Sequence, residues 1–201
     1  LNGATGTTCD TNTFTVTGNS FGGDATQVTL QHDGAGILSS ANTSSNTFSF
    51  SYEPAPSDAG NTINITVTTD NSGGIPCSPA VANYQLTVDA LPNTLLAVSD
   101  AEMCNSVIGD VTFTITGAES DVEYELQTIG GNSLTPQVTA TGTGADLDLT
   151  ILDANVPVVN TTYKVVAKRT TGSCDNVEVD LSDQPTLTIS YLPILTVGNV
   201  I

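Results

Sequence analysis

The chain repeats itself with a period close to 100 residues. The segment TFTVTG at Thr13–Gly18 recurs as TFTITG at Thr112–Gly117, and the pair Leu91-Pro92 recurs as Leu192-Pro193. Self-similarity at a fixed period is typical of a duplicated structural unit. The sequence therefore predicts two copies of one domain.

The boundary between the copies is expected at the first Leu-Pro pair. Pro92 has no amide hydrogen to donate to a strand ladder, so the last strand of the first copy must end before it. This places the two domains at residues 1–91 and 92–201. Because the linker is short, we also expect the domains to stack end to end as a rod, roughly 70 to 90 Å long if each strand of ten residues spans about 33 Å.

Apolar and polar residues alternate within each copy, which is the pattern of strands with one buried face. Short alternating segments separated by Gly, Asn, Asp and Pro predict an all-β fold of two tandem immunoglobulin-like antiparallel β-sandwiches, about seven strands each. The residues expected to point inward are Phe14, Val16, Val28, Leu30, Phe48, Phe50, Ile63, Ile65, Val67, Leu86 and Val88 in the first copy, and Phe113, Ile115, Tyr124, Leu126, Leu147, Leu149, Ile151, Tyr163, Val165, Ala167, Leu187 and Ile189 in the second.

Charge restricts the partners of the chain. The net charge is −18, and the three basic residues, Lys164, Lys168 and Arg169, all lie in the second copy. Binding to nucleic acid or to an anionic membrane surface requires clustered Lys and Arg, so we expect neither. No run approaches the roughly 20 apolar residues of a membrane-spanning helix. We expect an excerpt of a longer exported protein or a processed product.

Each copy carries one early and one late cysteine. Cys9 and Cys77 in the first copy match Cys104 and Cys174 in the second, and all four flank strands rather than fall within the alternating pattern. We predict the disulfides Cys9–Cys77 and Cys104–Cys174, formed in an oxidising compartment. Two free thiols in each domain are the alternative.

Catalytic and metal-binding chemistry have few candidates. The one histidine, His32, is expected in an exposed turn, and no Cys-x-x-Cys spacing suggests zinc. We expect no enzyme activity and no cofactor. Calcium is the metal we weigh, because it takes oxygen ligands; the candidates are Asp89 near the domain junction and Asp100 and Glu102 at the start of the second domain. Acidic residues also alternate along two strands of the second copy, where a solvated face is the simpler explanation.

The segment Asp58-Ala59-Gly60, which leads into Ile63, Ile65 and Val67, resembles the turn that opens the sixth strand of immunoglobulin-like domains. Asp153-Ala154-Asn155 is its counterpart in the second copy. The Thr- and Asn-rich, Lys-poor composition with cysteine-flanked repeats resembles the tandem repeats of very large Bacteroidota cell-surface adhesins, of the SprB type in gliding motility. That resemblance implies type IX secretion and an extracellular cell-surface location.

The leading functional hypothesis is a structural and adhesive stalk segment of a long secreted bacterial surface protein. Its partners would be neighbouring immunoglobulin-like repeats of the same chain, with a surface or glycan ligand that the sequence does not identify. A carbohydrate- or protein-binding β-sandwich module, and a subunit of an extracellular filament or S-layer, are the alternatives. Carbohydrate sites usually expose aromatic side chains, and the five Tyr and five Phe fall mostly on strands.

Overall fold

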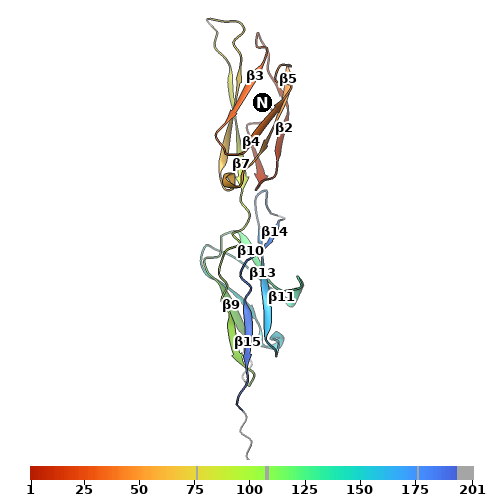
Figure 1. Cartoon of the computed structure of the whole chain (residues 1–201), viewed down its shortest axis with the longest axis vertical. Coiled ribbons are helices and arrows are strands. Elements are labelled where there is room, and N and C mark those ends of the chain that lie inside the picture. Colours follow the sequence, from red (N-terminus) through yellow and green to blue (C-terminus); the bar gives the residue numbers. More distant parts are fainter. Residues whose placement is uncertain (76, 107–108, 176, 194–201) are drawn as a thin grey trace, which may run out of the picture. The chain divides into compact units, whose positions relative to one another are not determined.

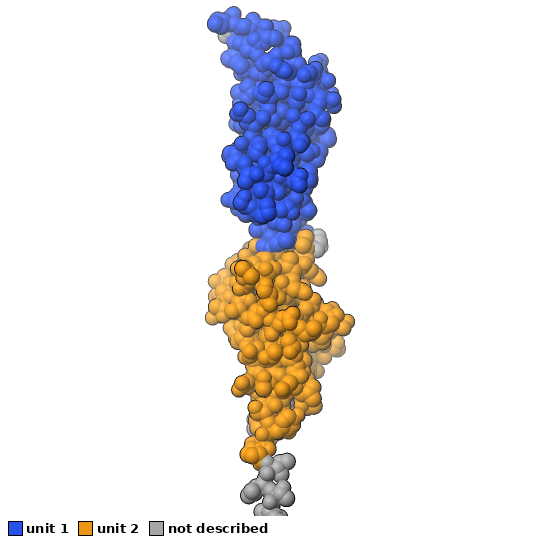
Figure 2. Space-filling model, viewed as in Figure 1, with its two compact units in different colours: residues 1–91, 171–175 blue, residues 92–170, 176–201 orange. Residues whose placement is uncertain are grey.

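The computed structural model describes residues 1–75, 77–106, 109–175 and 177–193. It divides into two compact units: unit 1 comprises residues 1–91 and 171–175, and unit 2 comprises residues 92–170 and 176–201 (Figure 2). The loop Thr171–Asp175, which the predicted boundaries assigned to the second domain, therefore belongs to unit 1. The chain passes between the units three times, after Leu91, Thr170 and Asp175.

Unit 1 is a sandwich of a four-stranded and a three-stranded sheet (Figure 1). The first sheet has the order β1 (Thr5–Cys9), β7 (Val81–Asp89), β6 (Thr62–Thr69), β3 (Val28–His32), and the second has the order β2 (Phe14–Ser20), β5 (Thr47–Glu53), β4 (Ile37–Ala41). A short 3₁₀ turn, η1 (Pro56–Asp58), precedes β6. This is the turn that the resemblance to immunoglobulin-like domains predicted.

Unit 2 follows the same plan with a different distribution of strands (Figure 1). Its larger sheet has the order β11 (Ser133–Thr141), β10 (Val122–Thr128), β13 (Thr161–Arg169), β15 (Thr186–Ser190), β8 (Ala101–Cys104), with β14 (Glu178–Asp180) also paired to β13. The smaller sheet pairs β12 (Leu147–Ile151) with β9 (Val111–Ile115). The turn η2 (Asp153–Asn155) occupies the place of η1.

The predicted fold class is confirmed. Every residue expected to point inward is buried or half-buried, and the buried ones form one core cluster in each unit. Burying each of these large apolar side chains contributes on the order of 1.5 to 3 kcal/mol, so these clusters determine the two folds. Among the strands of the described residues, neighbours are antiparallel except for β1 with β7 and β8 with β15, which run parallel.

The parallel pairs determine where the cysteines lie. In unit 1, Cys9 at the end of β1 stands opposite Asp89 at the end of β7. In unit 2, Cys104 at the end of β8 stands opposite Ser190 at the end of β15. Each early cysteine therefore lies at the end of its sandwich where the last strand finishes. None of the helices among the described residues is long and apolar enough to cross a membrane.

Candidate functional site

A disulfide joins Cys9 to Cys174 within unit 1. The Cα atoms are 5.0 Å apart, and both residues are buried, with 5% of Cys9 and none of Cys174 exposed. The bond connects residues 165 positions apart in the sequence, so it fixes a loop from the second sequence repeat onto the first sandwich. It is the most unusual chemical feature of the fold and the centre of the candidate site.

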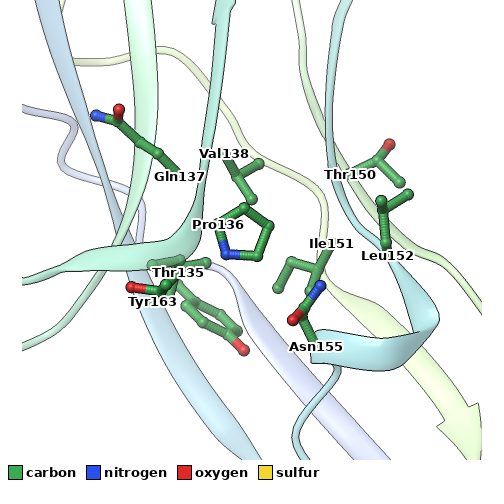
Figure 3. Close-up of a pocket in the computed structure, with 10 residues that line it drawn as sticks. Thr135, Pro136, Gln137, Val138, Thr150, Ile151, Leu152, Asn155 and Tyr163 are labelled. Carbon is green, nitrogen blue, oxygen red and sulfur yellow. The ribbon is translucent and has the colours of Figure 1, made fainter.

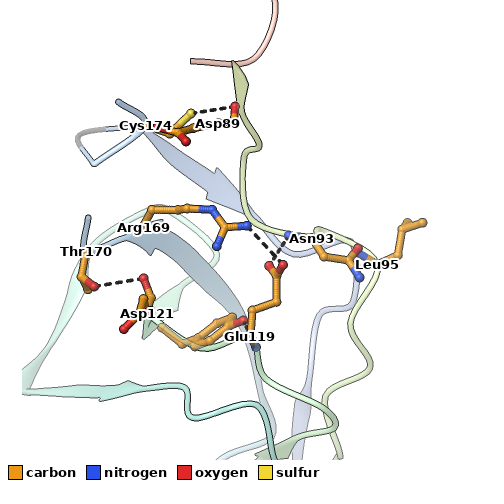
Figure 4. Close-up of polar contacts among 9 residues, drawn as sticks. Asp89, Asn93, Leu95, Glu119, Asp121, Arg169, Thr170 and Cys174 are labelled. Carbon is orange, nitrogen blue, oxygen red and sulfur yellow. Dashed lines mark hydrogen bonds and ion pairs between the residues drawn. The ribbon is translucent and has the colours of Figure 1, made fainter. Parts of the chain in front are cut away.

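Asp89 holds the same loop by hydrogen bonds. Its carboxylate accepts the backbone N–H of Ser173 at 2.6 Å and the Ser173 hydroxyl at 2.7 Å. The Cys174 sulfur lies 3.4 Å from the Asp89 carbonyl oxygen (Figure 4), a contact without a shared hydrogen because a disulfide sulfur carries none. The loop is thus attached by a covalent bond and by two hydrogen bonds to one charged side chain, which are stronger than neutral ones.

A glycine makes the close approach of the loop feasible. Gly172 has a φ angle of +88°, and a Cβ atom there would lie 2.8 Å from Oδ2 of Asp89. Any other L-residue would be strained in this backbone conformation and would displace the carboxylate that binds Ser173. The sequence Gly172-Ser173-Cys174 therefore acts as a short attachment motif.

The predicted pairing of Cys9 with Cys77 is wrong. Cys9 lies beside the last residue of β7, whereas Cys77 precedes the first residue of that strand. A nine-residue strand is roughly 27 Å long, and a disulfide requires Cα atoms within about 7 Å. Cys77 remains an exposed thiol in the structure.

The predicted pairing of Cys104 with Cys174 is wrong for the same reason. Cys104 lies at the end of β15, while Cys174 follows Arg169, the last residue of β13. Since β13 and β15 run antiparallel and their paired residues lie at the start of β13, the end of β13 is at the opposite end of the sheet. Cys104 is a half-buried thiol whose sulfur lies 3.1 Å from the Ser106 hydroxyl oxygen.

Polar contacts fix the segments of unit 2 that lead to this loop (Figure 4). Glu119 accepts the backbone N–H of Asn93 at 2.7 Å and forms an ion pair with Arg169 at 3.2 Å. Thr170 donates its N–H and its hydroxyl to the carbonyl of Asp121, at 2.9 and 3.0 Å. The residues immediately after Pro92 and immediately before the loop are therefore both anchored in unit 2.

Two of the three calcium candidates have other partners. The Asp89 carboxylate binds Ser173, as described, and Oδ1 of Asp100 accepts the Thr186 N–H at 2.7 Å and its hydroxyl at 2.9 Å. These bonds lower the pKa of Asp100. Glu102 is exposed on β8. In the described part of the chain, no three His, Cys, Asp or Glu side chains gather as a metal site would require.

The alternating acids of unit 2 also have partners within the sheet. Glu123 forms an ion pair with Lys168, and Glu125 accepts the side-chain amides of Gln127 and Gln137. Asp148 accepts the hydroxyl of Thr114 at 2.7 Å. These carboxylates thus take part in cross-strand contacts on a solvated sheet face.

His32 is not in an exposed turn, contrary to the prediction. It ends β3, is half-buried, and its ring packs edge-on against Tyr52 with centroids 5.1 Å apart. The neighbouring Asp33 carboxylate accepts the N–H and the side-chain amide of Asn64, at 2.7 and 2.6 Å. A hydrolytic triad would need an acid oriented toward the imidazole, and Asp33 is bound to Asn64 instead.

Tyr52, which packs against this histidine, is bonded to a buried acid that has a structural role. Asp58 is 4% exposed and accepts hydrogen bonds from the Tyr52 hydroxyl at 2.8 Å, the Ala35 N–H at 2.8 Å and the Ala55 N–H at 2.9 Å. Burial would raise the pKa of Asp58, but these hydrogen bonds outweigh it and hold the pKa below its ordinary value. Burial, with the Asp58 carboxylate beside it, raises the pKa of Tyr52 to about 12. The pair is a fixed hydrogen-bonded unit that offers no proton near neutral pH.

Unit 2 contains a pocket of about 330 Å³ between the edge of β11 and the end of β12 (Figure 3). The larger part of its lining surface is apolar, from Leu134, Pro136, Val138, Ile151 and Leu152, and its polar residues are Thr135, Gln137, Thr150 and Asn155. The only aromatic residue lining it, Tyr163, is 2% exposed. Of the ten aromatic residues, seven are buried, Phe14 and Phe21 are half-buried, and Tyr191 is exposed. The pocket therefore offers little aromatic surface on which a sugar ring could stack.

No protein-family model and no curated protein matches this chain. Among solved structures, a fragment of the titin I-band is similar, with a TM-score of 0.53 and 12% identity over 94% of this chain. The chain spans 63% of that fragment's length. Fibronectin(III)-like modules of Clostridium thermocellum CbhA align at a TM-score of 0.33 and 11% identity, over 98% of this chain and 96% of theirs. The titin likeness identifies the fold as immunoglobulin-like.

Proposed function

We propose that the chain is a structural and adhesive stalk segment of a long, secreted bacterial cell-surface protein. One observation carries the proposal: two sequence repeats fold as sandwiches on one plan, and a disulfide attaches a loop of the second repeat to the first sandwich. Such a bond links successive repeats covalently, which is a structural role that requires no catalytic residue. Disulfides persist mainly in oxidising compartments outside the cytosol, which supports an extracellular location.

The finer proposal is a repeat array of the gliding-motility adhesin type, exported across the outer membrane. It rests on the Thr- and Asn-rich composition, the repeat length and the net charge of −18. In such an array the neighbouring immunoglobulin-like repeats are the partners of this segment. Protease treatment of intact cells tests the location: we expect cleavage of the native protein without lysis, and full protection would contradict it.

Small-angle X-ray scattering of the 201-residue chain tests the stalk. A rod of two stacked sandwiches has a maximum dimension of roughly 70 to 90 Å, given strands of about 33 Å. We expect the same dimension at several salt concentrations. A compact particle much shorter than this would exclude the stalk.

A protein-binding module is the second candidate, favoured by the apolar pocket beside β11 (Figure 3). Apolar pockets with a few polar groups are typical of ligand sites. Substituting Leu152, which is 54% exposed at its rim, by aspartate would abolish such binding with little effect on folding. The scarcity of exposed aromatic side chains makes a carbohydrate ligand the weaker alternative.

A further inference from the structure

The two free cysteines occupy the same positions in their repeats as the two bonded ones. Cys104 matches Cys9: each ends the first paired strand opposite the last residue of the last strand, Ser190 and Asp89 respectively. The following turn is also shared, because Asn105 donates its N–H to Ser190 O at 3.0 Å as Asp10 does to Asp89 O at 2.8 Å. Cys104 thus sits in the setting of a bonded cysteine and lacks a disulfide partner.

Cys77 and Cys174 correspond in the same way. Cys77 lies in the loop between β6 and β7, and Cys174 lies in the loop between β13 and β14. The Cys77 loop is closed by two hydrogen bonds, from the Cys77 N–H to Gly74 O at 3.0 Å and from the Asn71 side chain to Cys77 O at 2.9 Å. Its thiol is exposed, so a partner can reach it without unfolding the loop.

Each repeat therefore carries an early cysteine at the end where its last strand finishes. Its late cysteine lies four residues before the strand that follows the loop, β7 in the first repeat and β14 in the second. In the one bond that forms, the early cysteine of the first repeat, Cys9, takes the late cysteine of the second, Cys174. We propose that Cys104 and Cys77 are the open halves of the same bond. Cys104 takes the late cysteine of a following immunoglobulin-like repeat, and Cys77 takes the early cysteine of a preceding one.

This proposal rests on the proposed stalk and deepens it, since it specifies how successive repeats are joined. The pairing is directional: early joins late, and each repeat offers one of each. Contacts of this head-to-tail kind propagate into an open chain rather than closing in a pair. Two adjacent repeats are thus linked twice, by the peptide linker and by a disulfide.

The chemistry is an oxidation of two thiols by a disulfide. A thiolate of the protein attacks one sulfur of the oxidant, oxidised glutathione or a thiol–disulfide oxidoreductase, and forms a mixed disulfide with release of the first oxidant thiolate. The second protein thiolate then attacks the protein sulfur of that mixed disulfide and releases the other oxidant thiolate. One S–S bond forms, and the oxidant takes two electrons and two protons and becomes two thiols. The hydrogen bond to Ser106 lowers the pKa of Cys104, which increases the thiolate fraction available for the first step.

Two departures between the repeats alter the polar part of the attachment. Ser190 stands where Asp89 accepts the bonds of Ser173, and Ile75 stands two residues before Cys77 where Gly172 precedes Cys174. The carboxylate anchor is therefore particular to the bonded pair. The repeat to which Cys104 binds needs only a cysteine between its sixth and seventh strands.

A tandem of two copies of this chain tests the inference. Joining position 196 of one copy to Leu1 of the next leaves 13 positions from Leu192 to the second Cys9, as from Leu91 to Cys104 in the native chain. The tandem has eight cysteines, twice four. Refolded in a glutathione redox buffer, it should show three disulfides: two Cys9–Cys174 bonds and one between Cys104 of the first copy and Cys77 of the second.

The readout is a thiol count with mass-spectrometric mapping of disulfide peptides. The proposal predicts two titratable thiols and the Cys104–Cys77 peptide, and Cys104→Ser in the first copy should restore the Cys77 thiol of the second. Four thiols with both Cys9–Cys174 bonds intact, or any other partner for Cys104, would overturn it. Small-angle scattering from the same tandem distinguishes the proposed inter-repeat disulfides from the proposed stalk function. An extended particle with four thiols contradicts the disulfides but agrees with a stalk. A compact particle contradicts the stalk.

Discussion

The two units have cores of the same pattern, but each places its fourth strand on a different sheet of the sandwich. In unit 1, β4 pairs with β5, and in unit 2, β11 pairs with β10. The connection after the third strand determines the difference. In unit 2 the hairpin is tight, with Gly131 at a φ of +80° and Thr128 N–H donating to Asn132 O at 3.0 Å, so β11 must return beside β10. Repeats with one core pattern can therefore differ in an edge because of a few loop residues.

In unit 1 the corresponding connection crosses to the other sheet. Asp58 accepts the Ala35 N–H and Tyr52 accepts the Gly36 N–H, each at 2.8 Å. A Cβ at Gly36 would lie 2.2 Å from the Glu53 carbonyl oxygen, so only glycine permits this close approach to β5. Buried polar groups thus direct the crossing in unit 1. In unit 2 the fourth strand stays beside the third, and a pocket lies between β11 and β12 (Figure 3).

Asp58→Ala should give the largest difference in stability between the two units. It removes the acceptor of three hydrogen bonds in a buried site, and each unsatisfied donor costs on the order of 1 to 3 kcal/mol. We expect unit 1 to lose about 3 to 5 kcal/mol of unfolding free energy, measured by urea denaturation with hydrogen exchange resolved by unit. Asp153→Ala at the matching, exposed turn of unit 2 is the control and should change stability by less than about 0.5 kcal/mol. Equal effects would contradict the assigned role.

Cys174→Ser, compared with Cys104→Ser, separates the effect of a bonded cysteine from that of a free one. Removing a native disulfide typically costs about 2 to 4 kcal/mol, and the loss should fall on unit 1, where Cys174 is bonded. Cys104→Ser removes a free thiol and should cost less than about 0.5 kcal/mol. Thermal unfolding of both variants, with and without a reducing agent, provides the measurement. If reductant lowers the melting temperature of Cys174→Ser as much as that of the native chain, the assigned bond is not the stabilising one.

Gly172→Ala isolates the attachment motif at smaller cost. Its backbone strain is expected to cost about 1 to 2 kcal/mol, and the new methyl group would displace the Asp89 carboxylate. Gly23→Ala has a similar φ of +72° with open space around the Cβ, so it measures the backbone strain alone. We expect Gly172→Ala to be the more destabilising by about 1 kcal/mol and to slow formation of the disulfide during refolding. If the Cys9–Cys174 disulfide formed at the same rate in Gly172→Ala as in the native chain, the Asp89 carboxylate would not guide the loop.

Added salt should give the smallest difference in stability between the two units. Unit 1 has eight carboxylate side chains and no Lys or Arg, whereas unit 2 has 13 carboxylates and the three basic residues. Among the described residues, each of these three bases forms an ion pair with a carboxylate of unit 2. Raising NaCl from 0.1 to 1 M screens repulsion in both units but also weakens the ion pairs of unit 2. We expect a gain of about 0.5 kcal/mol in unit 1 and a smaller one in unit 2, from denaturation at each salt concentration. A larger gain in unit 2 would mean that its ion pairs contribute nothing.

The sandwich fold and both cores were predictable because alternation reports burial directly. Phe48 and Phe50, or Leu187 and Ile189, identify their strands without reference to the rest of the chain. The edge strands β4 and β11 were not predicted, since Ser39, Ser40 and Thr139 lie on exposed positions where alternation carries little signal. Local patterns specify buried faces better than edges.

The cysteine pairing could not be read from the repeat. The spacing that matches Cys9 with Cys104 and Cys77 with Cys174 is satisfied equally by bonds within a repeat and by bonds between successive repeats. The register decides, because the parallel pairing of β1 with β7 puts Cys9 a full strand length away from Cys77. Parallel pairing of the first and last strands is a long-range property that no local pattern of residues records.

The bond between Cys9 and Cys174 also limits how far the chain can be stretched. When the two ends are pulled, the covalent path runs through the sulfur atoms, and the segment between the bonded residues, 165 positions apart, carries no extension. At about 3.3 to 3.6 Å per extended residue, roughly 550 Å of contour length stays hidden. A mechanical load would therefore extend only the segments before Cys9 and after Cys174. Unfolding of the strands between these two residues would not increase the end-to-end length of the molecule.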